Sequence, residues 1–203
     1  MPTPPYDIQM RLSNIMTCLT VTGDTLRILA ASLKGPFLEM LSVTTQSLLK
    51  NIETVKQNKN NCVVLMEQTY ELLNAIIILH IKSETGGELP PITLKHIGNF
   101  TETLHKIHTF VEAQQSGSKI KMFFRQGQMS TLLKDCKNGL KQGIEVFQIK
   151  TVDIMGDIAE IQQQAKTRHQ EVLAMIDALS DAAGSDGAST MSWIYSGHNR
   201  SPP

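Results

Sequence analysis

The chain has 203 residues, of which 41% are hydrophobic and 5% aromatic, and its 19 basic and 19 acidic side chains give a formal net charge of zero. A chain of this length can form one domain with a sizeable core, and the low aromatic share favours aliphatic helix packing over an aromatic-rich sheet. The charge balance argues against a dedicated nucleic-acid-binding protein, because such proteins usually carry a strong basic excess.

Cysteine usage and the N-terminal composition indicate the compartment. Cys18, Cys62 and Cys136 are odd in number and far apart, without a CxxC spacing. This pattern favours neither a disulfide framework nor a zinc site, and we expect three buried thiols in a reducing environment. The first ten residues lack the features of a secretory signal, and the longest strongly apolar run, residues 75–79, is shorter than the ~20 residues of a membrane span. We therefore expect a cytoplasmic protein.

Periodic apolar residues predict helices along the first half of the chain. A first helix is expected over residues 7–34, with a kink or break near Gly23. A second helix follows to about residue 57, and the polar cluster QNKNN at 57–61 indicates a tight turn between antiparallel neighbours. A third helix then ends near Ser83. Because the apolar pattern keeps its phase across QNKNN, a single long helix is the alternative.

The second half begins with the loop ETGGELPP, residues 84–91, which precedes the clearest amphipathic pattern. Its apolar residues step by 3, 4, 3 and 4 positions, the spacing of one helix face, at Ile97, Phe100, Leu104, Ile107 and Val111. Further helices are expected over residues 128–150 and 152–180, whereas residues 181–203 have the composition of a flexible linker. No segment alternates with period two, so the expected fold class is all-α, an up-down helical bundle with short turns.

Catalytic motifs are absent from the sequence. There is no Walker-type phosphate loop, GxGxxG, GxSxG or HExxH, so we predict a non-enzymatic protein without catalytic, cofactor-binding or metal-binding residues. His105 and His108 lie one helical turn apart and, with His96 or Glu112, could be drawn as metal ligands. Both flank the apolar face of the fourth helix, where polar side chains normally face water, which favours solvated histidines over a metal site.

Charge is distributed unevenly in the second half of the chain. Residues 119–150 carry seven basic and two acidic groups, and residues 151–186 carry two basic and seven acidic groups. The basic segment includes SKIKMFFRQGQMSTLLKDCKNGL, residues 118–140, whose mixture of cations, two phenylalanines and aliphatic residues could suit nucleic acid, an anionic membrane or a protein core.

Helical geometry separates these three possibilities. Lys134, Lys137 and Lys141 fall on one side of a helix and the apolar residues on another, while Phe123 and Phe124 are expected to enter the core. Cations outside the core attract an anionic lipid surface, each by about 1 kcal/mol. The candidate lipid-binding residues are Lys119, Lys121, Arg125, Lys134, Lys137 and Lys141. The alternative is a solvated basic face paired with the acidic last helix. No nucleic-acid partner is expected, because the aromatic residues are committed to packing.

Three stretches of the sequence resemble a known family. They are PFLEMLSVTTQSLLKNIETVKQNKNNCVVLMEQTYELLNAI, ETLHKIHTFVEAQQSGSKIKMFF and MSTLLKDCKNGLKQGIEVFQI. Together they resemble the N-terminal four-helix domain of the mixed-lineage kinase domain-like protein and its HeLo-type relatives in fungal NOD-like receptors. The resemblance covers roughly residues 36–180, and its most telling parts are the QNK turn and the Ser-Lys-x-x-x-Phe-Phe element.

This resemblance implies a domain organisation and a function. It implies a four-helix bundle over residues 36–150, an additional N-terminal helical segment over 1–35, a brace helix over 151–180 and a linker over 181–203. It further implies a cell-death effector or signalling domain of innate immunity. Such a domain self-associates and engages an anionic phospholipid membrane when a downstream nucleotide-binding or kinase-like domain of a longer chain releases it. The alternative function is a helical adaptor that binds partner proteins without lipid.

Overall fold

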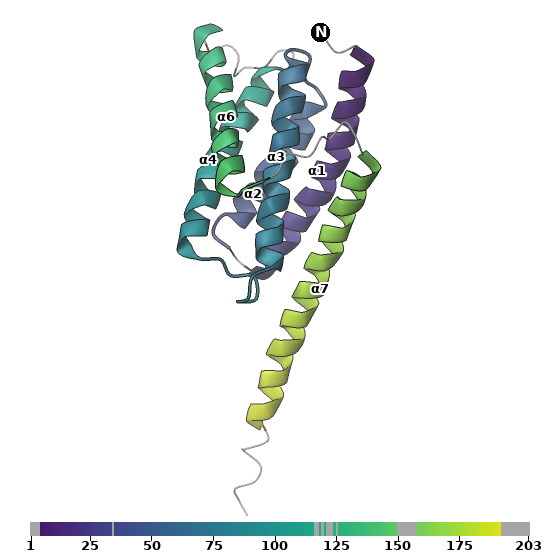
Figure 1. The fold of residues 1–203 in the computed structure, drawn as a ribbon, viewed down its shortest axis with the longest axis vertical. Helices are drawn as coiled ribbons and strands as arrows, with labels where there is room; N and C mark the ends of the chain where they lie inside the picture. The colour runs from purple at the N-terminus through teal and green to yellow at the C-terminus, as the bar shows by residue number, and fades with distance from the viewer. Residues whose placement is uncertain are drawn as a thin grey trace, which may run out of the picture.

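The computed structural model describes residues 5–33, 35–115, 118, 120, 124, 126–149 and 158–191. These residues form six α-helices and no β-strand, apart from an isolated bridge between Val55 and Gln115. The helices are α1 (Pro5–Leu33), α2 (Leu38–Ile52), α3 (Lys59–Ile81), α4 (Pro91–Ala113), α6 (Gln126–Val146) and α7 (Ile158–Met191). From α1 to α6 the chain runs in alternate directions (Figure 1). The expected all-α class is confirmed.

The first helix is continuous, although the sequence predicts a kink or break near Gly23. Gly23 is buried against α2, and a Cβ atom built on it would lie 3.6 Å from Thr45 Cγ2. The carbonyl oxygen of Gly23 also accepts a hydrogen bond from Ser42 Oγ at 3.4 Å. A Cβ atom at this position would make an ordinary van der Waals contact, and Gly23 lies within α1 without breaking it. The apolar face of α1 enters the same core as the other helices, through Leu12, Ile15, Leu19, Leu26 and Leu29.

The turn between α2 and α3 lies earlier than predicted. α2 ends at Ile52 and α3 begins at Lys59, which excludes a single long helix. The backbone N–H of Lys56 donates to the carbonyl oxygen of Gln114 at 3.3 Å, and Asn58 Nδ2 donates to Gln114 Oε1 at 2.9 Å. The turn residues are therefore bonded to the distant end of α4, which ends α2 before the predicted position.

The sequence predicts that this turn joins two antiparallel neighbours, but α2 and α3 are not close neighbours in the structure. In the described part of the chain, α1 packs against both α2 and α3, while α4 packs against α2 and α6 and, less extensively, against α3. The predicted face of α4 is fully inside this arrangement, with each residue at most 2% exposed, at Ile97, Phe100, Leu104, Ile107 and Val111. The amphipathic prediction for α4 is confirmed.

The last helix lies on the outside of the molecule. α7 packs against α1 and α3, and its C-terminal part runs past the ends of the other helices (Figure 1). It continues to Met191, whereas the sequence predicts a linker from residue 181. The start predicted for this helix, residue 152, falls outside the described residues.

Among the described helices, α3 is long and apolar enough by composition to cross a membrane, with a mean hydropathy of 1.5 over an 18-residue window. Of that window, 61% is buried inside the protein, where α3 contacts α1, α4, α6 and α7. A core helix surrounded by others has the same composition as a membrane span, so the packing accounts for its hydrophobicity. Polar residues interrupt the apolar sequence of α3, so its longest uninterrupted apolar run, residues 75–79, is short. The length of that run therefore underestimates how apolar the whole helix is.

Candidate functional site

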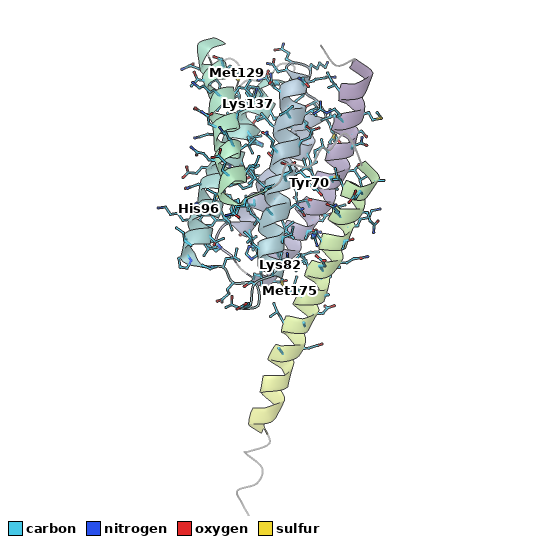
Figure 2. The ribbon with its side chains drawn as sticks, in the orientation of Figure 1. Tyr70, Lys82, His96, Met129, Lys137 and Met175 are labelled. Atoms are coloured by element: carbon cyan, nitrogen blue, oxygen red, sulfur yellow. The ribbon has the colours of Figure 1, made fainter. Side chains whose placement is uncertain are left out.

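The three described lysines of the candidate lipid-binding set lie on the solvent side of α6. Lys134, Lys137 and Lys141 are all exposed, and Figure 2 shows Lys137 near the middle of the helix. Cys136 and Leu140, on another side of the helix, are 0% exposed. The helical spacing thus separates charge from apolar packing as the sequence predicts. We call these three lysines the α6 basic row.

Two members of the α6 basic row have partners. Lys137 Nζ donates a hydrogen bond to Asn61 Oδ1, on α3, at 3.1 Å. Lys141 Nζ lies 3.8 Å from Glu145 Oε1, and both side chains are highly exposed, at 76% and 64%. A neutral amide leaves the charge of Lys137 intact, and an exposed ion pair of this kind contributes little to stability. The row therefore keeps positive charge at the surface, partly offset by Glu145.

Two glycines set the inner face of α6 against its neighbours. A Cβ atom on Gly139 would lie 2.6 Å from Thr103 Cγ2 of α4, and one on Gly143 would lie 2.9 Å from Leu72 Cδ2 of α3. Larger residues at these positions would push the helix outward. The glycines that weaken α6 as an isolated helix therefore fix which side of it faces solvent.

The other half of the candidate set lies outside the described residues. It comprises Lys119, Lys121 and Arg125; Phe123, which the sequence predicts to enter the core, also lies outside the described residues. Phe124 is partly buried, so its predicted entry into the core is incomplete. The described part of the surface is thus the α6 basic row alone.

The alternative reading paired this basic segment with the acidic last helix. Figure 1 shows α6 and α7 on opposite sides of α3. The ion pair of Arg168 is with Glu171 on α7 itself, at 2.7 Å, and that of Lys141 is within α6. For the α6 basic row, the tertiary arrangement does not favour pairing with α7.

The two histidines of the candidate metal pair have different surroundings. His108 Nε2 lies 3.1 Å from Asn51 Nδ2 and its Nδ1 lies 3.8 Å from Glu112 Oε2, while His105 is exposed. No group of three or more potential metal-binding side chains occurs within the described ranges. His108 therefore links α4 to α2.

The three thiols are free and buried, as predicted. Burial raises the pKa of Cys18 to about 11 and that of Cys62 to about 12. Burial likewise raises the pKa of Cys136 to about 12. A thiol that stays protonated at neutral pH is a poor nucleophile, so these cysteines act as packing groups.

Sequence reasoning missed a cavity beside α3. Its volume is about 300 Å³, and it lies between α3, the residues at the end of α6 and the first turns of α7. Ten residues line it: Tyr70, Glu71, Asn74, Ala75, Ile78, Leu79, Phe147, Ile149, Ile161 and Gln164. The one local signal was a glutamate within a strongly apolar helix. The cavity itself depends on three segments that are far apart in sequence.

Comparisons of the chain with protein-family models, with curated proteins and with solved structures gave no match. The family resemblance therefore rests on the three quoted stretches of sequence.

Proposed function

We propose that the chain is a non-enzymatic cell-death effector or signalling domain that self-associates and engages anionic membranes when a downstream sensor domain releases it. The observation that carries this proposal is the α6 basic row, exposed on one side of a helix whose other side is buried. Each cation near an anionic bilayer contributes about 1 kcal/mol. Three such cations, partly offset by Glu145, raise membrane affinity by roughly one to two orders of magnitude, which is enough to detect.

In this proposal α2, α3, α4 and α6 form the four-helix bundle, α1 is the additional helix and α7 is the brace. Support comes from the position of α7, which packs against α1 and α3 and lies apart from α6. Thr25 Oγ1 on α1 lies 2.9 Å from His169 Nδ1, and Tyr70 on α3 donates a hydrogen bond to the carbonyl oxygen of Ile161 at 3.4 Å. Separation of α7 would break both of these polar contacts between described residues of α7 and the other helices.

Vesicle binding tests the membrane part of this proposal. The full chain is mixed with phosphatidylcholine vesicles that contain or lack phosphatidylserine, at low and high salt, and the bound fraction is measured by co-sedimentation. We expect binding only to the anionic vesicles, weakened by salt because exposed charges are screened. A dye-leakage assay on the same vesicles reports membrane disruption.

A triple charge reversal locates the binding surface. The variant Lys134→Glu, Lys137→Glu and Lys141→Glu is expected to lose anionic vesicle binding. A matched control reverses three exposed lysines elsewhere, with the same change in net charge, at Lys56, Lys82 and Lys95. Equal loss in both variants would show a net-charge effect and refute the α6 basic row as the binding surface.

The release step needs its own measurement. Val172→Asp places a charge in the buried face of α7, where Val172 is 0% exposed, and should detach α7 without removing any part of the chain. We expect this variant to bind anionic vesicles more strongly than the native chain. If neither protein binds anionic vesicles at low salt, the membrane function is wrong.

A helical adaptor is the second candidate function, and a different surface favours it. Met40 and Val43 on α2 are 43% and 57% exposed. Val43 also borders a surface groove of about 370 Å³ between α1 and α2, which Arg27 and Glu39 line as well. Exposed aliphatic residues beside a groove suit the apolar face of a partner helix.

Self-association and vesicle binding, measured on the same variants, together discriminate the adaptor from the membrane effector. Val43→Asp is compared with Met10→Asp, a control at an apolar residue that is 49% exposed on α1, by sedimentation velocity. An adaptor should lose association only with Val43→Asp, and the reversal of the α6 basic row should leave association unchanged. A membrane effector should show the opposite sensitivity in vesicle binding.

A further inference from the structure

The cavity beside α3 has walls from three parts of the chain. α3 supplies one wall, Phe147 and Ile149 at the end of α6 supply a second, and Ile161 and Gln164 of α7 supply the third. Its volume of about 300 Å³ is at the lower end of the range of small-molecule sites. Figure 2 places Tyr70, one of the lining residues, between α3 and α7.

The chemistry of these walls is mostly apolar. The apolar lining residues are Ala75, Ile78, Leu79, Phe147, Ile149 and Ile161. Burial raises the pKa of the Tyr70 hydroxyl, which therefore stays protonated, and this hydroxyl already donates to the carbonyl oxygen of Ile161. The walls thus suit an apolar molecule of modest size with a small polar end.

The charged group that lines the cavity is acidic. Glu71 is only 8% exposed, and a buried carboxylate is costly unless it is paired and hydrogen-bonded. Glu71 has a further interaction within the chain, but a carboxylate offers about four acceptor directions and can accept additional donors.

We propose that this cavity binds a small cationic amphiphile, an apolar chain or ring that carries one ammonium group. The ammonium group pairs with the Glu71 carboxylate, and the apolar part lies among Ala75, Ile78 and Phe147. Charge complementarity favours this ligand over a fatty acid, because the carboxylate of a fatty acid would be repelled by the carboxylate of Glu71. The site is distinct from the α6 basic row, which attracts anions, and does not rest on the proposed membrane function.

Binding at this position has a mechanical consequence. A ligand that touches α3, the end of α6 and α7 together binds only while α7 is in place. By mass action it stabilises the docked position of α7. The ligand therefore opposes the release of α7 from the other helices, independently of the function of that release.

Methyl NMR of the full chain tests the site with three probes of equal chain length: octylammonium, octanol and octanoate. We expect octylammonium to shift the methyl resonances of Ala75, Ile78, Ile149 and Ile161 at the lowest concentration, octanol to shift them more weakly and octanoate not to shift them. Octanoate binding as tight as octylammonium, or no shift with any probe at its solubility limit, would overturn the proposal.

Two variants test the residues. Glu71→Gln should weaken octylammonium by about tenfold, because a charge-assisted hydrogen bond becomes a neutral one, while octanol is unaffected. Glu102→Gln, at an exposed glutamate of α4, is the control and should bind as the native chain does. Ala75→Leu fills the cavity and should abolish all binding. If Glu71→Gln fails to fold, native-like binding by Ala75→Leu would still refute the site.

Hydrogen exchange separates this inference from the membrane proposal. Octylammonium should slow amide exchange along α7 in the native chain and leave α4 unchanged. Slower exchange without any vesicle binding would leave the cavity proposal standing and refute only the membrane function. Unchanged exchange at saturating octylammonium would refute the stabilisation of α7.

Discussion

α4 and α7 have similar apolar periodicity, but the structure buries them to different degrees. α4 packs against α2, α6 and α3, and its apolar face is fully buried. α7 packs against α1 and α3; Ile161, Ala165 and Val172 are buried, but Leu173 is 40% exposed. Figure 2 shows Met175, which is partly buried, where α7 begins to leave the other helices.

This difference shows that periodicity reports which face of a helix is apolar, not how strongly that face is held. An enclosed helix loses packing on several sides when one residue is truncated. A peripheral helix can detach and leave the rest of the core intact, because its opening requires few broken contacts. Mutations in α4 should therefore act on the whole fold, and mutations in α7 on α7 alone.

The largest expected effect is that of Leu104→Ala on α4. Leu104 is 0% exposed, and truncation of a buried leucine typically costs about 2–5 kcal/mol through lost burial and a cavity. Urea denaturation followed by circular dichroism should show this loss as a lower midpoint for the entire chain. A native-like midpoint would contradict the central position of α4.

A smaller effect is expected at the contact between α6 and α4. Gly139→Ala should cost about 1–3 kcal/mol by overpacking, because its Cβ would meet the stiff side chain of Thr103. Gly127→Ala on the same helix is the control: a Cβ there has no atom within 4 Å, so the substitution should be neutral or stabilising by up to about 1 kcal/mol. Equal midpoints in urea denaturation would show that α6 is not closely packed.

Val172→Ala should have a more local effect. Removal of two buried methyl groups costs roughly 1–2 kcal/mol, and this loss should appear as faster hydrogen exchange within α7. The urea midpoint of the remaining helices should change little. An equal increase in the hydrogen exchange of α4 and α7 would show that both helices belong to one cooperative unit. That result would contradict the proposed difference between them.

The pH dependence of the loop beside α7 sharpens the comparison further. His80 is buried and its Nδ1 lies 2.6 Å from the carbonyl oxygen of Gly87, in the loop where Gly86 lies against Leu179 of α7. Burial lowers the pKa of His80 below its ordinary value of 6.5. The unfolded chain therefore binds more protons than the folded chain below about pH 6.5, and stability should fall as the pH drops through this range.

His80→Asn provides the test of this pH effect. Asparagine can keep a donor for the Gly87 carbonyl oxygen but cannot be protonated in this range, so the variant should lose part of the dependence between pH 6.5 and lower values. Thermal unfolding at several pH values measures it. A pH profile identical to that of the native chain would assign the effect to other groups.

Local sequence patterns determined a large part of this structure. The apolar face of α4, the burial of the cysteines and the exposure of the α6 basic row all follow from side-chain polarity at helical spacing. Such patterns depend on residues within a few turns of one another. They predicted the existence of the helices and the side of each that faces inward.

The remaining features depended on contacts between distant segments. Gln114 fixes the end of α2 through the turn before α3, and Glu71 lines a cavity only because the end of α6 and the first turns of α7 meet α3 there. One-dimensional periodicity carries no information on which helix covers which face. Packing between helices decides this, because each apolar face has several possible partners and the whole core must be filled at once.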